Sequence, residues 1–274
     1  MTAVAFLGPV GTHTEEALLS LEMADATPQP YPSIDDVFTA VDRGKAALGV
    51  VPIENSIEGS VNATLDGLAF GGDLTIQREI VRDIHHALVA APGVALHEIT
   101  EIVSHPQASG QCRRWITTEL PGKPVVAANS TAEAVQRAVA KSGIGAIGTA
   151  LAAKLYGGEV VEDAIEDYAG NQTRFVMIGR GIQPRTGQDK TSLALFIHES
   201  RPGALLMILS EFAFGQINLT KIQSRPTKRQ LGDYMFFVDL EGHVTDPQVS
   251  LALDCLRLKL REVKVLGSYP RVSG

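Results

Sequence analysis

The chain has few of the features that mark secreted or membrane proteins. Its 274 residues include only two cysteines, Cys112 and Cys255, far apart in the sequence, so we expect reduced thiols in a cytoplasmic protein rather than a disulfide framework. The first residues lack a basic segment followed by a long apolar run, and no apolar run reaches the length of a membrane span. Internal repeats and low-complexity tracts are also missing.

Basic charge is scarce as well. The formal net charge is −7, and residues 1–192 carry 14 Lys and Arg against 23 Asp and Glu. A basic surface for nucleic acid is therefore not expected. An anionic ligand would gain no long-range attraction to this part of the chain, so local hydrogen-bond donors would have to hold it.

Short apolar runs alternate with helical patterns through the first 180 residues. Two helix starts are well marked, because Ser33 precedes IDDVFTAVDRG with Asp36 three residues on, and Ser130 precedes TAEAVQRAVAKSG with Glu133 three residues on. The alternation predicts an α/β domain with largely parallel sheets. The expected strands are VAFL, AALGVV, TIQREIV, HHALVAA, EIVS, VVAA, GAIG, AIED and TRFVMIG.

The pattern changes near residue 180. The stretch GRGIQPRTGQDKTS combines Gly, Pro and charge with few apolar residues, and we interpret residues 181–192 as a linker after a domain of residues 1–180. Beyond it, residues 193–271 follow the order strand, helix, strand, strand, helix, strand. This order predicts a ferredoxin-like βαββαβ domain.

Polar clusters follow several expected strands. In GPVGTHTEEAL a glycine turn precedes a helix that Thr12 or Thr14 could cap, and the free N–H groups of a helix start suit an anion. In VVPIENSIEGSV the residues Asn55, Ser56 and Ser60 gather with no histidine or cysteine to activate a hydroxyl. Plain helix capping or a turn would explain either cluster alone.

Two further clusters contain groups with more specific chemistry. In SHPQASGQC the adjacent Ser104 and His105 would point to opposite faces of a strand, and the chain has no GxSxG elbow, so we do not expect a serine hydrolase. In YAGNQTRF the residues Thr173 and Arg174 open a strand, and Arg174 can hold a carboxylate in a bidentate pair.

The remaining candidates have plainer interpretations. His85 and His86 are expected to pack along a strand rather than bind a metal. Cys112 and Trp115 fit a helical core pattern. The acidic residues within 162–167 are interpreted as a solvated loop.

In this order, GPVGTHTEEAL, VPIENSIEGSV, SHPQASGQC and NQTRF, followed by GALLMIL and NLTKIQSRP, resemble the motifs of a prephenate dehydratase with a C-terminal ACT domain. The resemblance implies an α/β catalytic region of two lobes, similar to type II periplasmic binding proteins, with the active site in the cleft. It also implies phenylalanine feedback through the ACT domain. The reaction turns prephenate into phenylpyruvate with loss of water and carbon dioxide, and aromatisation drives it, so neither a cofactor nor a metal is expected.

The resemblance carries roles onto residues of this chain. It implies catalytic roles for Thr173, Asn55, Ser104 and Gln111, and substrate contacts for Arg174, Thr12, Ser56 and Phe175. The expected effector site, at an interface between two chains of a homodimer or homotetramer, comprises Gly203, Ala204, Leu205, Asn218, Leu219, Thr220, Ser224 and Arg225.

The match has departures, and two alternatives stay open. His13 stands where an aromatic residue is usual, Thr14 where serine is usual, and Gln223 replaces the glutamate of the Glu-Ser-Arg-Pro motif. An arogenate dehydratase would differ only in an amino group on the substrate. A non-catalytic protein that binds a small acid is the other alternative, and the attached ACT-like domain favours a regulated enzyme over it.

Overall fold

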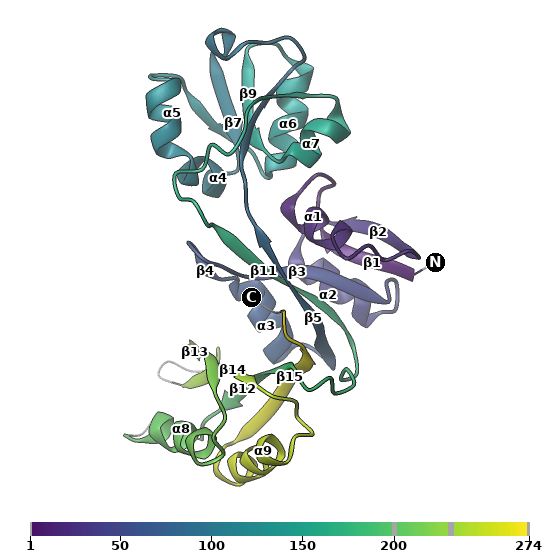
Figure 1. Cartoon of the computed structure of the whole chain (residues 1–274), viewed down its shortest axis with the longest axis vertical. Helices are drawn as coiled ribbons and strands as arrows, with labels where there is room; N and C mark the ends of the chain where they lie inside the picture. The colour runs from purple at the N-terminus through teal and green to yellow at the C-terminus, as the bar shows by residue number, and fades with distance from the viewer. Residues whose placement is uncertain (1, 199–201, 230–232, 273–274) are drawn as a thin grey trace. The chain divides into compact units, whose positions relative to one another are not determined.

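The chain divides into two compact units in the computed structural model, which describes residues 2–198, 202–229 and 233–272 (Figure 1). Unit 1 comprises residues 1–61 and 81–175, and unit 2 comprises residues 62–80 and 176–274. The strands β5 (Leu74–Asp83) and β11 (Gln172–Arg180) each run from one unit into the other.

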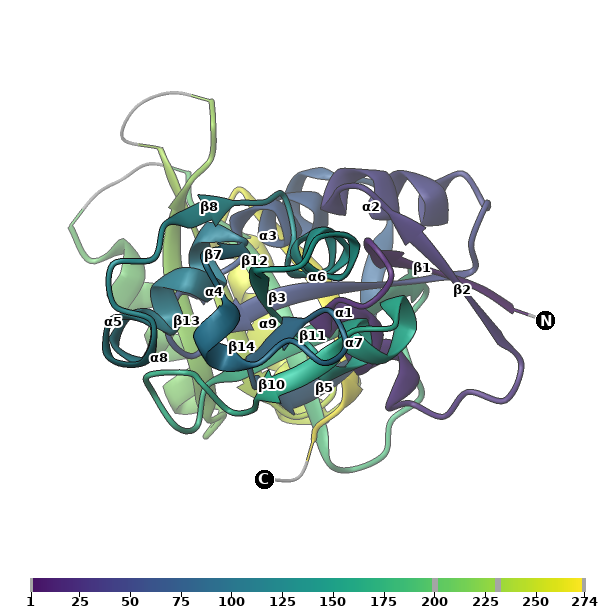
Figure 2. The same cartoon turned by 90° about the horizontal axis from the view of Figure 1, so that it is seen from above.

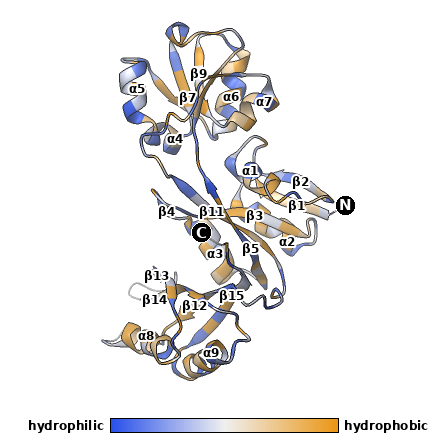
Figure 3. Ribbon diagram, in the orientation of Figure 1, coloured by the Kyte–Doolittle hydropathy of each residue, from blue (hydrophilic) through white to orange (hydrophobic). Residues whose placement is uncertain are grey.

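The first part of unit 1 is a parallel sheet with helices between its strands. Strand β1 lies between β2 and β3 and runs parallel to both, and β4 folds back on the end of β3. Figure 3 colours β1 mostly as hydrophobic, and Val4, Ala5 and Phe6 of this strand are fully buried. The elements are β1 (Thr2–Leu7), α1 (His13–Leu19), β2 (Ala26–Tyr31), α2 (Ile34–Asp42), β3 (Leu48–Asn55) and β4 (Gly59–Ser60).

The second part of unit 1 is a five-stranded sheet in the order β10-β6-β9-β7-β8. Strand β7 is parallel to β8 and β9, whereas β6 is antiparallel to β9 and β10. Helix α6 lies along β9 and β7, and most of the residues that it buries are alanines. Its neighbour is α7 (Figure 1 and Figure 2). The elements are β6 (Ala87–Ala90), η1 (Leu96–Glu98), β7 (Glu101–Ser104), α4 (Pro106–Gln111), α5 (Arg113–Glu119), β8 (Val125–Ala127), α6 (Thr131–Ala140), β9 (Ile144–Gly148), α7 (Ala150–Tyr156) and β10 (Glu159–Glu162).

Two of the predicted helix starts are confirmed. The Ser33 hydroxyl accepts a hydrogen bond from the Asp36 N–H at 3.1 Å, and the Ser130 hydroxyl accepts one from the Glu133 N–H at 3.0 Å. These bonds satisfy N–H groups that a helix start leaves without an intrahelical partner. Thr12 precedes α1, but its hydroxyl donates to the Leu7 carbonyl instead of capping the helix.

Unit 2 contains the predicted βαββαβ arrangement, with the antiparallel sheet order β13-β14-β12-β15. Its apolar core lies between this sheet and the helices α8 and α9. In the described part of the chain, no helix is both long enough and apolar enough to cross a membrane. The elements are α3 (Asn62–Phe70), β12 (Asp189–Phe196), α8 (Ala204–Phe214), β13 (Leu219–Pro226), β14 (Tyr234–Glu241), α9 (Pro247–Lys259) and β15 (Glu262–Pro270).

Three details of the predicted elements are wrong. The strand β2, ATPQPY, was not predicted, since prolines are rare in strands; β2 lies at the end of its sheet order, where a missing N–H donor is tolerated. AIED is not a strand, and the neighbouring residues Glu159–Glu162 form β10 instead. Strand β12 begins at Asp189, so the last four residues of the predicted linker belong to a strand.

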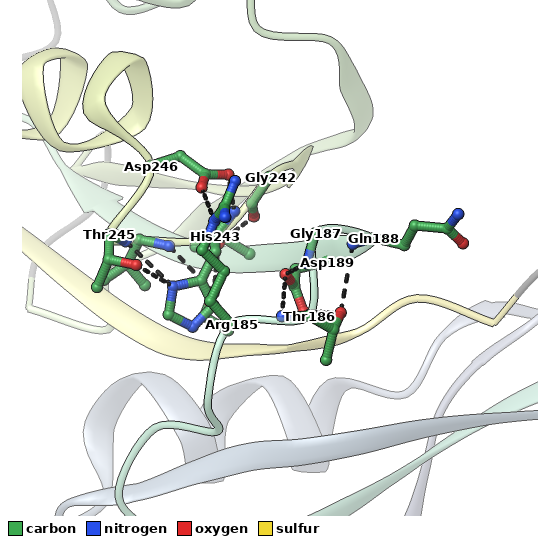
Figure 4. Close-up of polar contacts among 12 residues, drawn as sticks. Arg185, Thr186, Gly187, Gln188, Asp189, Gly242, His243, Thr245 and Asp246 are labelled. Carbon is green, nitrogen blue, oxygen red and sulfur yellow. Dashed lines mark hydrogen bonds and ion pairs between the residues drawn. The ribbon is translucent and has the colours of Figure 1, made fainter.

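The residues just before β12 are tied down by hydrogen bonds within unit 2 (Figure 4). The buried Asp189 carboxylate accepts bonds from the Thr186 N–H at 2.9 Å, the Thr186 hydroxyl at 2.7 Å and the Gly187 N–H at 2.9 Å. The buried His243 ring has its Nε2 2.9 Å from the Gln183 carbonyl oxygen and donates to it. This segment is therefore an anchored part of unit 2.

We predict that Asp189→Asn destabilises the protein by about 1–3 kcal/mol near neutral pH. Burial alone would raise the pKa of Asp189, but the hydrogen bonds from Thr186 and Gly187 lower it below the ordinary 3.8. The carboxylate therefore contributes stability above pH 3.8, and this contribution is lost as the pH falls through the lower folded-state pKa.

Urea unfolding of the two proteins at neutral and acid pH measures this difference. The difference in the free energy of unfolding between wild type and Asp189→Asn should be smaller at acid pH than at neutral pH. Gln188→Ala, at the exposed neighbouring position, is the control. Its free energy of unfolding should lie within about 0.5 kcal/mol of that of wild type at both pH values. Equal stability of Asp189→Asn and wild type at neutral pH would contradict the prediction.

Candidate active site

The polar clusters predicted from the sequence meet at one pocket in unit 1. The pocket has a volume of about 400 Å³, within the range of small-molecule sites. Each of the four clusters contributes to its lining, with Thr12, Asn55, Gln111 and Thr173. The ends of β1, β3, β7 and the start of β11 deliver these residues, because turns and short helices follow the strands there. Phe175 lines the same pocket.

Asn55 is fixed by hydrogen bonds on both sides of its amide group. Its Nδ2 donates to the Thr173 Oγ1 at 2.9 Å and to the Asn171 Oδ1 at 2.8 Å. Its Oδ1 accepts from the N–H groups of Ile57 and Glu58, both at 3.0 Å, which shapes the turn after β3. Since Thr173 accepts from Asn55, the proton of its own hydroxyl remains available to donate into the pocket.

A second set of bonds extends this network across the pocket. The Gln111 Oε1 accepts from the Asn171 Nδ2 at 3.0 Å and lies 3.0 Å from the His86 Nε2. His86, Gln111 and Asn171 are 3, 6 and 2% exposed, so each bond is formed away from bulk water. One hydrogen-bonded chain therefore joins His86 to Thr173 through Gln111, Asn171 and Asn55.

Sequence reasoning missed two members of this network. Asn171 lies inside the quoted NQTRF motif but was not singled out, and His86 was expected only to pack. The available signal for Asn171 was an amide two residues before Thr173, at the start of an apolar strand pattern. Nothing in the sequence indicated that His86 would reach Gln111.

Two predicted hydroxyls do not line the pocket. The Ser104 side chain is fully buried, and its hydroxyl donates to the Ile147 carbonyl at 2.8 Å. The Ser56 hydroxyl accepts a bond from the Gln172 N–H at 2.9 Å and so links the turn after β3 to β11. Both positions are structural in this arrangement, and the catalytic or binding roles assigned to them stay predictions.

Arg174 does not line the pocket either. It lies between Thr173 and Phe175 on β11, and neighbouring residues of a strand point to opposite faces. Its Nη1 lies 4.0 Å from the Glu54 Oε2. The role of Arg174 as a carboxylate clamp stays a prediction.

The predicted solvated acidic loop is only half solvated. Glu162 and Asp163 are exposed, but the Glu166 carboxylate accepts from the His86 N–H at 3.0 Å and pairs with the His85 ring at 2.8 Å. Burial alone would raise the pKa of Glu166, and these hydrogen bonds lower it overall.

Burial lowers the pKa of His86, against a smaller opposing effect of Gln111, so this ring is neutral near pH 7.

A second pocket, of about 680 Å³, lies in unit 2 and is mostly apolar. Gly203, Ala204, Leu205 and Ser224 line it, as expected for the effector site. The other predicted effector residues are not among its lining residues; these are Asn218, Leu219, Thr220 and Arg225.

Arg225 has a different partner in unit 2. It holds the Asp66 carboxylate of α3 in a bidentate pair, through its Nε and Nη2 at 2.6 Å each. Among the described residues, no group of three or more His, Cys, Asp or Glu side chains is arranged to hold a metal ion.

Residues 4–183 match the family model described as Prephenate dehydratase. A prephenate dehydratase of Mycolicibacterium vanbaalenii is 40% identical, over 98% of this chain and 91% of that protein. The crystal structure of a prephenate dehydratase from Arthrobacter aurescens in complex with L-Phe has 40% identity and a TM-score of 0.91, covering 98% of this chain and 90% of that one.

Another solved structure, described as GqqA, a novel type of quorum quenching acylase, has 29% identity and a TM-score of 0.88, with 98% of each chain covered. The family model and the curated relative together cover nearly the whole sequence. The chain belongs to the prephenate dehydratase family.

Proposed function

We propose that the pocket of unit 1 binds prephenate and converts it to phenylpyruvate. The bond between the ring and its carboxylate breaks, its electron pair passes into the ring, and the ring hydroxyl leaves as hydroxide, which takes up a proton from solvent to become water. The products are carbon dioxide, water and an aromatic acid. The observation that carries the proposal is the Asn55–Thr173 hydrogen bond at the pocket wall.

Thr173 is proposed to act on the departing hydroxyl. Its oxygen accepts from Asn55, which leaves its proton for a donor bond to the leaving oxygen. A threonine hydroxyl is a poor acid, so we do not assign a full proton transfer to Thr173. A hydrogen bond that strengthens as negative charge develops on the leaving oxygen lowers the barrier.

The uncharged character of the described pocket lining suits a reaction that releases carbon dioxide. Of the described residues that line the pocket, none is Lys, Arg, Asp or Glu. A fixed cation against the ring carboxylate would stabilise the ground state and oppose its departure. Neutral amide and hydroxyl groups orient the substrate without this penalty.

The acylase relative represents a different chemistry, which this pocket does not favour. Amide hydrolysis by a covalent route needs a hydroxyl or thiol activated by a neighbouring base. Among the described lining residues, no hydroxyl is hydrogen-bonded to an imidazole or a carboxylate; Thr12 donates to a backbone carbonyl, and Thr173 accepts from an amide.

Unit 2 is proposed to contain an ACT domain that binds phenylalanine. Its βαββαβ order and its apolar pocket, in which Ser224 and Tyr234 supply hydroxyls beside Leu205 and Phe236, support this proposal. The relative from Arthrobacter aurescens was solved with L-Phe. We propose a catalytic domain of residues 1–180, with two lobes like those of periplasmic binding proteins, and an ACT domain that ends near residue 271 and begins with β12 at Asp189 rather than at residue 193. We also propose assembly as a homodimer or homotetramer and a cytoplasmic location, in keeping with the free thiols of Cys112 and Cys255.

Replacing Thr173 tests the catalytic proposal. Thr173→Val keeps the shape but removes the hydroxyl, so kcat for prephenate should fall on the order of 10²-fold or more with KM largely kept. Thr173→Ser keeps the hydroxyl and should retain most of the activity. The absorbance of phenylpyruvate in alkali measures both. Turnover by Thr173→Val at the wild-type rate would overturn the assignment, and no turnover by wild type would overturn the proposed reaction.

Removing Asn171 tests the network. Asn171→Ala leaves the second acceptor of Asn55 missing and removes a donor to Gln111, so kcat/KM should fall by roughly 10-fold to 10²-fold. Because Asn55 and Asn171 hold Thr173 as a unit, the double variant Asn55→Ala/Asn171→Ala should lose less than the product of the two single losses. Strictly multiplicative losses would show that the two amides act independently.

A matched pair of leucine substitutions tests the effector pocket. Phenylalanine should raise the melting temperature of wild type and shift its sedimentation toward a larger species. Leu205→Asp places a carboxylate in the pocket wall and should abolish both responses. The variant should still fold and keep its basal activity, because an acidic residue is favourable in the first turn of a helix. Leu258→Asp, on the exposed face of α9, is the control and should respond like wild type. A normal response of Leu205→Asp would place the effector elsewhere.

A further inference from the structure

The proposed reaction assigns no role to the buried ring of His86 or to the acidic segment 162–167. Both meet at Gln111, which lines the active-site pocket and is 6% exposed. His86 contacts its side chain at 3.0 Å, and the Asp167 N–H donates to its backbone carbonyl at 2.7 Å. What Gln111 offers to a ligand depends on which way its amide faces, because the oxygen can only accept and the nitrogen can only donate.

Backbone groups fix the orientation of the first amide in the network. The Asn55 Oδ1 accepts from the N–H groups of Ile57 and Glu58, and a backbone N–H can only donate. The Asn55 Nδ2 is therefore the end that contacts Asn171, and the Asn171 Oδ1 accepts from it at 2.8 Å. The other end of Asn171, its Nδ2, then donates to the Gln111 Oε1 at 3.0 Å.

The same sequence of bonds fixes the ring of His86. The Gln111 Oε1 accepts from Asn171 and cannot donate, so the His86 Nε2, 3.0 Å away, carries the hydrogen and donates it. The other ring nitrogen, Nδ1, is buried and has no hydrogen-bond partner in the described part of the chain. The contact with Gln111 is thus the hydrogen bond that orients this ring.

The segment 165–167 holds His86 and Gln111 in register. The Ile165 N–H donates to the His86 carbonyl at 2.9 Å, and the Glu166 carboxylate accepts from the His86 N–H at 3.0 Å. The next residue, Asp167, holds the Gln111 carbonyl. Three consecutive residues therefore tie together two backbone positions that lie 25 residues apart in the sequence.

The Gln111 amide is held at its oxygen end and left open at its nitrogen end. Two donors converge on its Oε1, so a flipped amide would bring its NH₂ group against both of them. Its Nε2 makes one long contact within the described residues, at 3.5 Å to the Glu58 Oε1, which is a weak hydrogen bond at best. At least one N–H group of Gln111 is therefore left for a ligand of the pocket.

We propose that His86 is a positioning residue, which through its Nε2–H keeps the N–H groups of Gln111 available to the pyruvyl end of prephenate. The inference rests on the prephenate pocket proposed above. The ring hydroxyl is already assigned to Thr173, and a donor fixed on the ring carboxylate would stabilise the ground state and oppose loss of carbon dioxide. The pyruvyl oxygens are the acceptors that remain.

This role has a kinetic signature of its own. The pyruvyl group does not change in the reaction, so a hydrogen bond to it stabilises the bound substrate and the transition state equally. Loss of that bond should raise KM and leave kcat nearly unchanged, whereas loss of the Thr173 hydroxyl should lower kcat.

Calorimetric titration of the full chain with phenylpyruvate measures the same bond without turnover, because phenylpyruvate retains the pyruvyl group. His86→Leu removes one of the two donors that hold the Gln111 amide. It should weaken phenylpyruvate binding roughly tenfold and raise KM for prephenate by a similar factor, with kcat within about threefold of wild type. His86→Gln supplies a neutral N–H in place of Nε2–H and should restore both values to within about threefold.

A double variant tests whether His86 acts through Gln111. Gln111→Met keeps the length of the side chain but removes both ends of the amide, so it should weaken phenylpyruvate binding at least as much as His86→Leu. Adding His86→Leu to Gln111→Met should cause little further loss. His85→Gln, which alters the exposed neighbouring histidine, is the control and should bind phenylpyruvate like wild type.

Nitrogen-15 NMR gives an independent result. It should show His86 as the Nε2–H tautomer and a shift of the Gln111 side-chain NH₂ signals when phenylpyruvate is added. An Nδ1–H tautomer, wild-type binding by His86→Leu, a fall in kcat at unchanged KM, or strictly multiplicative losses in the double variant would overturn the positioning role and leave the dehydratase assignment intact. Wild type that binds phenylpyruvate but fails to turn over prephenate would instead overturn the proposed function of the pocket.

Discussion

The site depends on the requirement that buried amide groups be satisfied. Asn55 has two N–H donors and one carbonyl oxygen; Asn171, Thr173 and the turn after β3 use all of them. Leaving any one unpaired would cost about 1–3 kcal/mol, so the network holds one arrangement. The position of the Thr173 hydroxyl follows from that arrangement, so the fold itself places the group that we propose to act on the substrate.

A network of neutral groups also suits the reaction. Loss of a carboxylate as carbon dioxide is hindered by fixed cations, and the pocket has no Lys or Arg among its described lining residues. His86 and Thr173 lie at the two ends of one hydrogen-bonded chain through Gln111, Asn171 and Asn55.

Much of this could be predicted from the sequence, because local signals fix local structure. The caps at Ser33 and Ser130, the βαββαβ order, and the gathering of polar clusters after the strands each follow from a short pattern. Contacts across long sequence separations were not visible, since Asn55 meets Asn171 across 116 residues. Ser104 and Arg174 show a further limit: a residue at a strand end can point to either face, and the motif does not say which.

A crystal structure of the full chain with an unreactive, ring-saturated analogue of prephenate tests the central claim most directly. The account predicts that the analogue's ring hydroxyl lies within about 2.6–3.2 Å of the Thr173 Oγ1, while the Asn55 Nδ2 still donates to that oxygen. An analogue bound with its ring hydroxyl on another group, or with the Asn55–Thr173 bond broken, would contradict it.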